Sequence, residues 1–379
     1  MIYLDHAATT PTHDTALEVF VNVSKHYYGN PSSLHDIGAE AKQLLEAGRR
    51  TIAKILEAET DEIVFTGGGS ESNQLAIKAL LSSVDSAKNH LIVSEVEHSS
   101  VRNLFEQLEL SGFNVSKIGV DSSGRISLNE LENLITERTA LISIQHANSE
   151  TGVIQDVEKI GQLSKKYGVL FHSDCVQTFC KIGIDSKWFD AASVSSHKVY
   201  GPKGVGAFYL KKNIDYKPEI SGTSQEKGIK AGTQNVAGIA AFATAAKLTY
   251  ANRSDEFVRL TMLRAKLIDG FKNSGIECVD EGASEHKLPN ILGLRFTGME
   301  GQFLMLECSQ TGLAISTGSA CQAGSEKPNR TMKAMGRSDE EAREFVRLSL
   351  GSQNSEEQID VIIEKIDTIL KRHFAKVKF

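Results

Sequence analysis

The chain has 379 residues, of which 40% are hydrophobic and 24% are charged, and its formal net charge is -6 with a pI near 6.0. This length is enough to bury one large core and a second, smaller one. The acidic balance leaves no surplus of lysine and arginine to neutralise a phosphate backbone, so we expect no nucleic-acid partner. No stretch reaches the roughly 18 consecutive apolar residues of a membrane span, so we expect no membrane association.

The opening stretch, "MIYLDHAATT", lacks the basic region and apolar run of a signal peptide, and we expect a soluble, cytoplasmic protein. Further on, short β-branched runs alternate with longer amphipathic stretches: "EIVFTG" with "SESNQLAIKALL", "HLIVSE" with "SSVRNLFEQLEL", and "ALISIQ" with "QDVEKIGQLSKKY". This alternation predicts an α/β fold of βαβ units around a mostly parallel sheet, with helices on its faces. We predict a large domain over residues 15–250.

The last third of the chain has a different pattern. A long helical stretch, "SDEFVRLTMLRAKLIDGFKNSG", is followed by strand-like residues near "NILGLRFTG" and by a final helix, "SEEQIDVIIEKIDTILKRHF". These elements predict a smaller α+β domain, formed by residues 1–14 and 251–379.

A glycine-rich turn follows the first strand of the alternating region, in "IVFTGGGSESNQLAIKAL". Such a turn before a helix presents free backbone N–H groups and a positive helix end to an anion, and Gly69 and Ser70 are the best phosphate contacts. The turn has neither the lysine of a Walker loop nor the G-x-G-x-x-G spacing of dinucleotide folds. Taken alone, it is more often a tight connection.

Two further strand ends carry Asp174, in "VLFHSDCVQ", and Lys198, in "FDAASVSSHK". An unpaired carboxylate at the end of a buried strand is costly, although a surface or capping aspartate is the more common role. Ligands of open α/β sheets lie beyond the carboxyl ends of the strands. Pyridoxal 5'-phosphate has three needs. A lysine binds its aldehyde, an aspartate keeps its pyridine nitrogen protonated, and a cup of backbone N–H groups holds its phosphate. The three strand ends together predict this cofactor.

These stretches also resemble a known family. "YLDHAATTP", "GNPSSLH", "SESN", "EHSSV", "HANSETG", "HSDCVQ", "SSHKVYGPKGVGA", "AGTQN", "STGSACQ" and "RLSLG" occur in the order typical of group I cysteine desulfurases, the NifS and IscS type, which are fold type I pyridoxal phosphate enzymes. The resemblance runs from residue 2 to about residue 360. It implies a mostly parallel seven-stranded sheet in the large domain. It also implies conversion of L-cysteine to L-alanine, with the sulfur left as a persulfide on an enzyme cysteine.

The resemblance further implies roles for individual residues. Lys198 would bind the cofactor aldehyde, Asp174 would contact the pyridine nitrogen, and His98 would stack on the ring and take part in catalysis. Arg347 would bind the substrate carboxylate, which a guanidinium suits better than an ammonium. The other implied contacts are Asn148 and Gln177 beside the phenolic oxygen, Asn148 also beside the substrate, and Gly69, Ser70, Ser195 and His197 around the phosphate.

Simpler structural roles compete for several of these residues. His98 could cap the helix that follows it, His197 could bond a backbone carbonyl, and Arg347 could form a surface ion pair. The resemblance also implies a homodimer in which Thr233, in "AGTQN", reaches the cofactor phosphate of the neighbouring subunit. The competing role for Thr233 is a cap of the following helix.

Cys321 is the expected carrier of the persulfide. The five cysteines, at positions 175, 180, 278, 308 and 321, are spaced neither as a disulfide framework nor as zinc ligands, so we expect reduced thiols and no metal site. Cys321 lies in "STGSACQAGSEKPNRT", a small and polar stretch typical of an exposed loop, which we expect to be mobile over residues 319–330. Cys175 is expected to be a packing residue only.

The acceptor of the sulfur is left open by the sequence. The resemblance implies a protein acceptor, such as an iron–sulfur scaffold or an iron–sulfur apoenzyme. Lys227, Lys230 and Ser149 depart from the usual family residues and look like a branch linked to NAD biosynthesis. The alternative enzymes are a selenocysteine lyase or another fold type I enzyme such as an aminotransferase, and the alternative of a different class is a cofactor-binding scaffold that only docks partner proteins.

Overall fold

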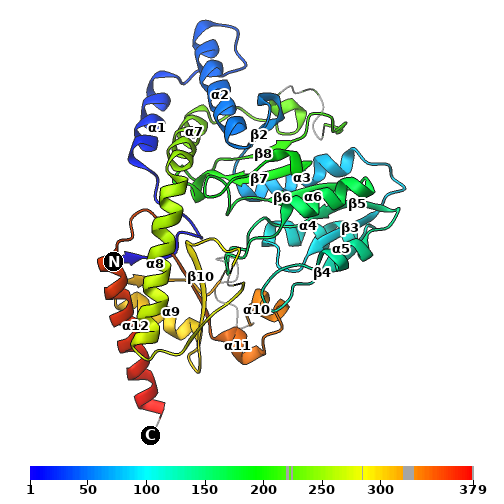
Figure 1. The fold of residues 1–379 in the computed structure, drawn as a ribbon. Helices are drawn as coiled ribbons and strands as arrows, with labels where there is room; N and C mark the ends of the chain where they lie inside the picture. The colour runs from blue at the N-terminus through cyan, green and yellow to red at the C-terminus, as the bar shows by residue number, and fades with distance from the viewer. Residues whose placement is uncertain (219–221, 223–224, 284, 319–327, 378–379) are drawn as a thin grey trace.

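The computed structural model describes residues 1–377 apart from residues 219–221, 223–224, 284 and 319–327 (Figure 1). Its largest feature is a seven-stranded sheet. In spatial order the strands are β2 (Ile63–Thr66), β8 (Gly206–Leu210), β7 (Ala191–Ser195), β6 (Leu170–Asp174), β5 (Thr139–Ser143), β3 (His90–Ser94) and β4 (Asn114–Ile118). Only β8 runs antiparallel to its neighbours, β2 and β7. The predicted mostly parallel seven-stranded sheet is therefore confirmed.

Helices cover both faces of this sheet, because successive strand residues point to opposite sides. Val64 packs with helices α3 (Gly69–Ser82) and α4 (Ser99–Leu110), whereas its neighbours Ile63 and Phe65 pack on the other face. That other face is covered by α2 (Asp36–Ile55), α5 (Leu128–Leu134), α6 (Val157–Tyr167) and α7 (Val236–Ala251). With both faces buried, β2 and β5 to β8 consist almost entirely of buried residues.

Helix α7 also forms a layer with α2 and with α1 (Asp14–His26), at the top of Figure 1. Its alanine-rich sequence allows close approach on more than one side: Ala241 and Ala245 pack against Ala16 of α1, and Val236 packs near Ala41 of α2. The helix therefore anchors the N-terminal helices to the large sheet.

A second core surrounds the smaller antiparallel sheet β12–β10–β9, whose strands are Phe345–Ser349, Ile291–Phe296 and Cys278–Asp280. The long helix α8 (Arg253–Asn273) descends from α7 and packs beside α12 (Glu356–Val377) (Figure 1). Strands β1 (Ile2–Tyr3) and β11 (Leu313–Ala314) pair in parallel, which brings Leu4 into the same core. The remaining helices are α9 (Gly301–Gln310), α10 (Arg330–Ala334) and α11 (Asp339–Arg343). The domain limits at residues 14 and 250 stay a prediction.

Among the described residues, no helix combines the length and the apolar character that a membrane crossing requires.

Candidate active site

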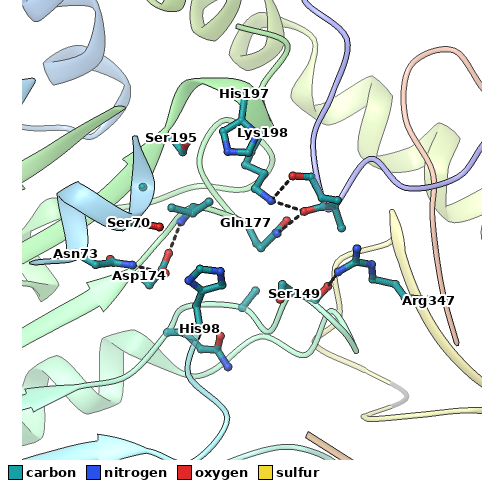
Figure 2. Close-up of a pocket in the computed structure, with 16 residues that line it drawn as sticks. Ser70, Asn73, His98, Ser149, Asp174, Gln177, Ser195, His197, Lys198 and Arg347 are labelled. Atoms are coloured by element: carbon teal, nitrogen blue, oxygen red, sulfur yellow. Dashed lines mark hydrogen bonds between the residues drawn. The ribbon is translucent and has the colours of Figure 1, made fainter. Parts of the chain in front are cut away.

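A cavity of about 250 Å³ lies at the carboxyl ends of β5, β6 and β7 (Figure 2). Parallel strands of an open sheet bind ligands at this edge. The cavity brings together most of the residues expected at the site, although they come from distant parts of the chain. Those that line it are Gly69, Ser70, His98, Asp174, Gln177, Ser195, His197, Lys198 and Arg347.

Lys198 ends the 3-10 turn Ser196–Lys198 that directly follows β7, and its side chain enters the cavity (Figure 2). Its Nζ donates to the carbonyl oxygens of Ala7, at 2.5 Å, and Ala8, at 2.7 Å. Burial, followed by the positive charges of Arg347 and Lys181, lowers the pKa of Lys198 to about 7. A large fraction of this side chain is therefore a neutral amine at pH 7, the form that attacks an aldehyde.

Asp174 is the last residue of β6 and is only 8% exposed. Its carboxylate accepts hydrogen bonds from Asn73 Nδ2 at 2.8 Å and from the backbone N–H of Val176 at 2.9 Å. Among the described residues, no lysine or arginine forms an ion pair with Asp174. A buried carboxylate without a cation is unfavourable, so the site lacks one positive charge that a protonated pyridine nitrogen would supply.

The glycine turn after β2 forms a cup for an anion. Gly68 has a φ of 151°, a conformation that favours glycine, and Gly69 begins α3, so that the positive end of this helix lies at the cavity. A Cβ atom on Gly69 would lie 2.9 Å from Val176 Cγ2 and 3.3 Å from the Cβ of Ser195. A Cβ atom on Gly206 of β8 would lie 2.7 Å from the backbone of Gly68. A side chain at position 69 or position 206 would clash with these atoms, so glycine is needed at both.

Three buried oxygen atoms at the cavity have no hydrogen-bond partner among the described residues: Ser195 Oγ beside the cup, Gln177 Oε1 and Asn73 Oδ1. Buried polar groups are normally paired, so these atoms are available for a ligand. A cup for a phosphate, an unpaired carboxylate and a neutral amine surround one space. This set of groups fits pyridoxal phosphate.

Two histidines, His98 and His197, line the cavity. His98 caps α4, since its Nδ1 accepts the N–H of Ser100 at 3.2 Å, and its ring also borders the cavity. The capping role and the position at the site therefore coexist, and the acceptor role of Nδ1 leaves the ring hydrogen on Nε2. His197 Nδ1 lies 3.1 Å from the hydroxyl of Thr9 rather than beside a carbonyl. Burial lowers the pKa of His98, and burial together with Lys198 lowers that of His197 to about 4.

Arg347 reaches the cavity from β12 of the smaller sheet, so the site lies between the two cores. It is 2% exposed, and is thus not a surface residue. Its guanidinium contacts Asp5 Oδ1 at 2.6 Å and donates to the carbonyl of Ser149 at 2.9 Å, while Nε has no partner. This arrangement holds a cation at the cavity wall, where a carboxylate could bind.

Two expected residues, Asn148 and Thr233, do not line this cavity. Asn148 lies nearby, but its Oδ1 accepts the backbone N–H groups of Glu150 and Thr151, which fixes its own loop. Thr233 is exposed and lies outside the cavity of its own chain. Cys321 and its proposed mobile loop, up to residue 327, lie outside the described residues. The roles of these residues stay predictions.

The sequence interpretation missed residues that the structure places at the cavity: Ala7, Ala8, Asn73, Gln145, Ala147, Ser149 and Val176. Asn73 was the most predictable of these, because it lies four residues after Gly69 on the same face of α3. Its Nδ2 also donates to Ser100 Oγ at 2.9 Å, so that it joins Asp174 to the His98 cap. No local pattern marks the carbonyls of Ala7 and Ala8.

Comparison with known proteins identifies the family. The sequence matches the family described as aminotransferase class-V over residues 2–362. The chain belongs to the class-V aminotransferase family. Within that family it is 43% identical over 367 residues to the putative cysteine desulfurase NifS of Bacillus subtilis (strain 168), an alignment that covers 96% of this chain and 93% of that protein. The chain is thus a member of the NifS-type cysteine desulfurase group.

Two solved structures that are similar to this chain agree with this assignment. A NifS-like protein superposes with a TM-score of 0.91 at 36% identity, over 98% of this chain and 99% of the other. The structure titled SspA in complex with cysteine gives a TM-score of 0.82 at 34% identity, over 92% of this chain and 99% of the other. These names favour the cysteine desulfurases over the selenocysteine lyase and aminotransferase alternatives.

Proposed function

We propose that this protein is a pyridoxal phosphate-dependent cysteine desulfurase, which converts L-cysteine to L-alanine and carries the sulfur as a persulfide on Cys321. The observation that carries the proposal is the position of Lys198, a partly neutral amine at the wall of a cavity that also holds the unpaired carboxylate of Asp174. When bound there, pyridoxal phosphate supplies an aldehyde that captures amines and a ring that accepts electron density.

In this proposal, different residues of the cavity bind the cofactor ring, the phosphate and the substrate. Asp174 holds a proton on the pyridine nitrogen, because the negative charge favours the protonated ring. His98 stacks on the ring and Gln177 contacts its phenolic oxygen. Arg347 binds the substrate carboxylate through paired hydrogen bonds. The phosphate is held by the helix end at Gly69 together with Ser70, Ser195 and His197.

Lys198 then acts as the base and acid of the reaction. As a neutral amine it removes the proton from the Cα atom of the substrate, and it returns protons to the product. The thiolate of Cys321 attacks the sulfur of the substrate, so that an S–S bond forms while the bond between the substrate's Cβ and sulfur breaks. The remaining three-carbon unit takes up a proton and leaves as alanine. One thiol plus cysteine gives one persulfide plus alanine, and no oxidant is required.

The other cysteines are poorly suited to this attack. Cys175, Cys180 and Cys308 are buried, and burial raises the pKa of Cys175 and of Cys308 to about 12 and that of Cys180 well above its usual value. Burial also raises the pKa of Cys278 to about 11. A thiol must ionise to attack sulfur, so each of these four remains a weak nucleophile near pH 7. This supports Cys321 as the persulfide carrier.

Replacing Cys321 by serine tests the proposal. After a brief reaction with L-cysteine, the wild-type protein is expected to carry one additional sulfur atom on the peptide that contains Cys321, detected by mass spectrometry. Cys321→Ser should still bind the cofactor and change its absorption on adding L-cysteine, but should gain no sulfur and release no alanine. Cys278→Ser is the matched control and should behave as wild type. Normal alanine release by Cys321→Ser would contradict the assignment.

We also propose a homodimer in which Thr233 contacts the phosphate bound by the partner chain. Thr233 is exposed and does not line the cavity of its own chain, so its hydroxyl is available to another subunit. Light scattering should give the mass of two chains, and Thr233→Ala should weaken cofactor binding by about tenfold, the effect of losing one charge-assisted hydrogen bond. A monomer that binds the cofactor with full affinity would exclude this contact.

The sulfur acceptor that we propose is a cytoplasmic protein, either an iron–sulfur scaffold or an iron–sulfur apoenzyme. The departures at Ser149, Lys227 and Lys230 support an acceptor linked to NAD biosynthesis. Transfer of labelled sulfur from L-cysteine to candidate acceptors would identify it.

A further inference from the structure

A second, smaller cavity of about 50 Å³ adjoins the first one at Lys198. Lys198 lines both cavities and forms part of the wall between them. The residues of the second cavity that bear charge or titrate are His6, Cys180, Lys181, Tyr200, Arg253 and Glu256. The charged side chains that line this cavity are therefore close enough to change the protonation of Lys198.

Lys181 is the unusual residue of this second cavity. It follows Cys180, whose φ of 61° turns the chain after β6, and its Nζ is buried with no hydrogen-bond partner. A buried ammonium without a partner is rare, because desolvation of the charge is not offset. Nothing in the mechanism derived above uses this amine, so its position requires a separate explanation.

Within the part of the chain that the structure describes, no carboxylate forms a hydrogen bond with Lys181. The acidic residue of the cavity, Glu256, is held by Arg259 through two hydrogen bonds of 2.7 Å each. Arg253 adds a second positive charge, and its described contacts are the carbonyl and the ring of Tyr250. Around this cavity the described side chains therefore leave an excess of positive charge.

We propose that Lys181 is a positioning residue for Lys198: its positive charge in the cavity that both lysines line disfavours a second cation there and keeps the nitrogen of Lys198 in the neutral form that the reaction needs. This inference rests on the proposed function of Lys198.

The charge states of the two lysines agree with this assignment. Burial lowers the pKa of Lys181 to about 8, so that it is mostly charged at pH 7, and its charge is one of the causes that lower the pKa of Lys198 to about 7. The same charge lowers the pKa of His6 and of His197, each to about 4, although burial is the larger cause in both. Lys181 thus affects three groups around the cofactor lysine.

Other charged groups also act on Lys198. Arg347 acts on Lys198 with the same sign as Lys181, whereas Asp174 and Asp5 act with the opposite sign. Among the described residues, the charged or titratable groups that act on the two lysines or line the second cavity include Asp5, His6, His98, Asp174, Cys180, His197, Tyr200, Arg253, Glu256 and Arg347. Removing Lys181 therefore shifts the balance at Lys198 towards the protonated form.

The experiment measures the pH midpoint at which the visible absorption of bound pyridoxal phosphate changes, which reports protonation of the Lys198 nitrogen. Lys181→Met and Lys181→Gln remove the charge and are expected to raise this midpoint by about one pH unit. Lys181→Arg keeps the charge and should keep the wild-type midpoint. Lys159→Met, at an exposed lysine of α6, is the matched control and should cause no shift.

Thermal unfolding separates this electrostatic role from a structural one. Replacing a buried, unpaired ammonium by an apolar side chain of similar length should leave the melting temperature of the loaded enzyme unchanged or higher. A midpoint unchanged in both neutral variants, or raised equally in Lys181→Arg, would overturn the inference while the proposed function stands. A wild-type protein that binds no pyridoxal phosphate would instead overturn the proposed function, and the inference with it.

Discussion

Lys198→Ala is expected to lose the visible absorption of bound pyridoxal phosphate on dialysis and to form alanine from L-cysteine at least about 10³-fold more slowly than wild type. Among the described residues that line the cavity, no other side chain carries a primary amine. The substitution removes both the group that binds the aldehyde and the group that moves the substrate's Cα proton. Neither loss should be restored by raising the substrate concentration.

The control for this variant is Lys203→Ala, which removes an exposed lysine a few residues further along the same loop. It should retain the absorption and the rate of wild type. If Lys198→Ala retained cofactor that borohydride fixes to the protein, a different amine would hold it, and the assignment of this site would be wrong.

Asp174→Asn is expected to retain part of the cofactor and to lower the rate of alanine formation by about 10²-fold. An asparagine carbonyl can still accept the N–H of Val176, so the local structure should be kept. The negative charge is lost, however, and the pyridine nitrogen is then protonated for only a small fraction of the time. Cofactor content by absorption and alanine formation by amino-acid analysis measure the two effects separately.

The matched change for this prediction is Asp269→Asn, in α8, where the carboxylate is 69% exposed and distant from the cavity. It should leave both measurements unchanged. Wild-type turnover in Asp174→Asn would show that another residue keeps the ring protonated.

The large sheet and its binding edge were predictable because their signals are local. Short β-branched runs alternate with amphipathic stretches, and three of the strands end in a glycine turn, an aspartate and a lysine. Parallel strands place these ends at one edge. The order of the strands, and the antiparallel direction of β8, depend on connections that no local pattern encodes.

Contacts between distant segments were the part that the sequence could not supply. Asp5 and Arg347 are separated by 342 positions in the chain and meet at 2.6 Å. The N-terminal residues Ala7 and Ala8 supply the carbonyls that hold Lys198. Lys181 has no motif around it, and its role follows only from its burial at a cavity that it shares with Lys198. Each of these depends on how the two cores pack together.

The measurement that tests the central claim most directly is product formation from L-cysteine by the purified protein loaded with pyridoxal phosphate. With a thiol reductant present to release the persulfide sulfur, the protein is expected to form alanine and sulfide in equal amounts, and Lys198→Ala should form neither. A loaded wild-type protein that forms pyruvate and ammonia in place of alanine, or that leaves L-cysteine unchanged, would contradict the account.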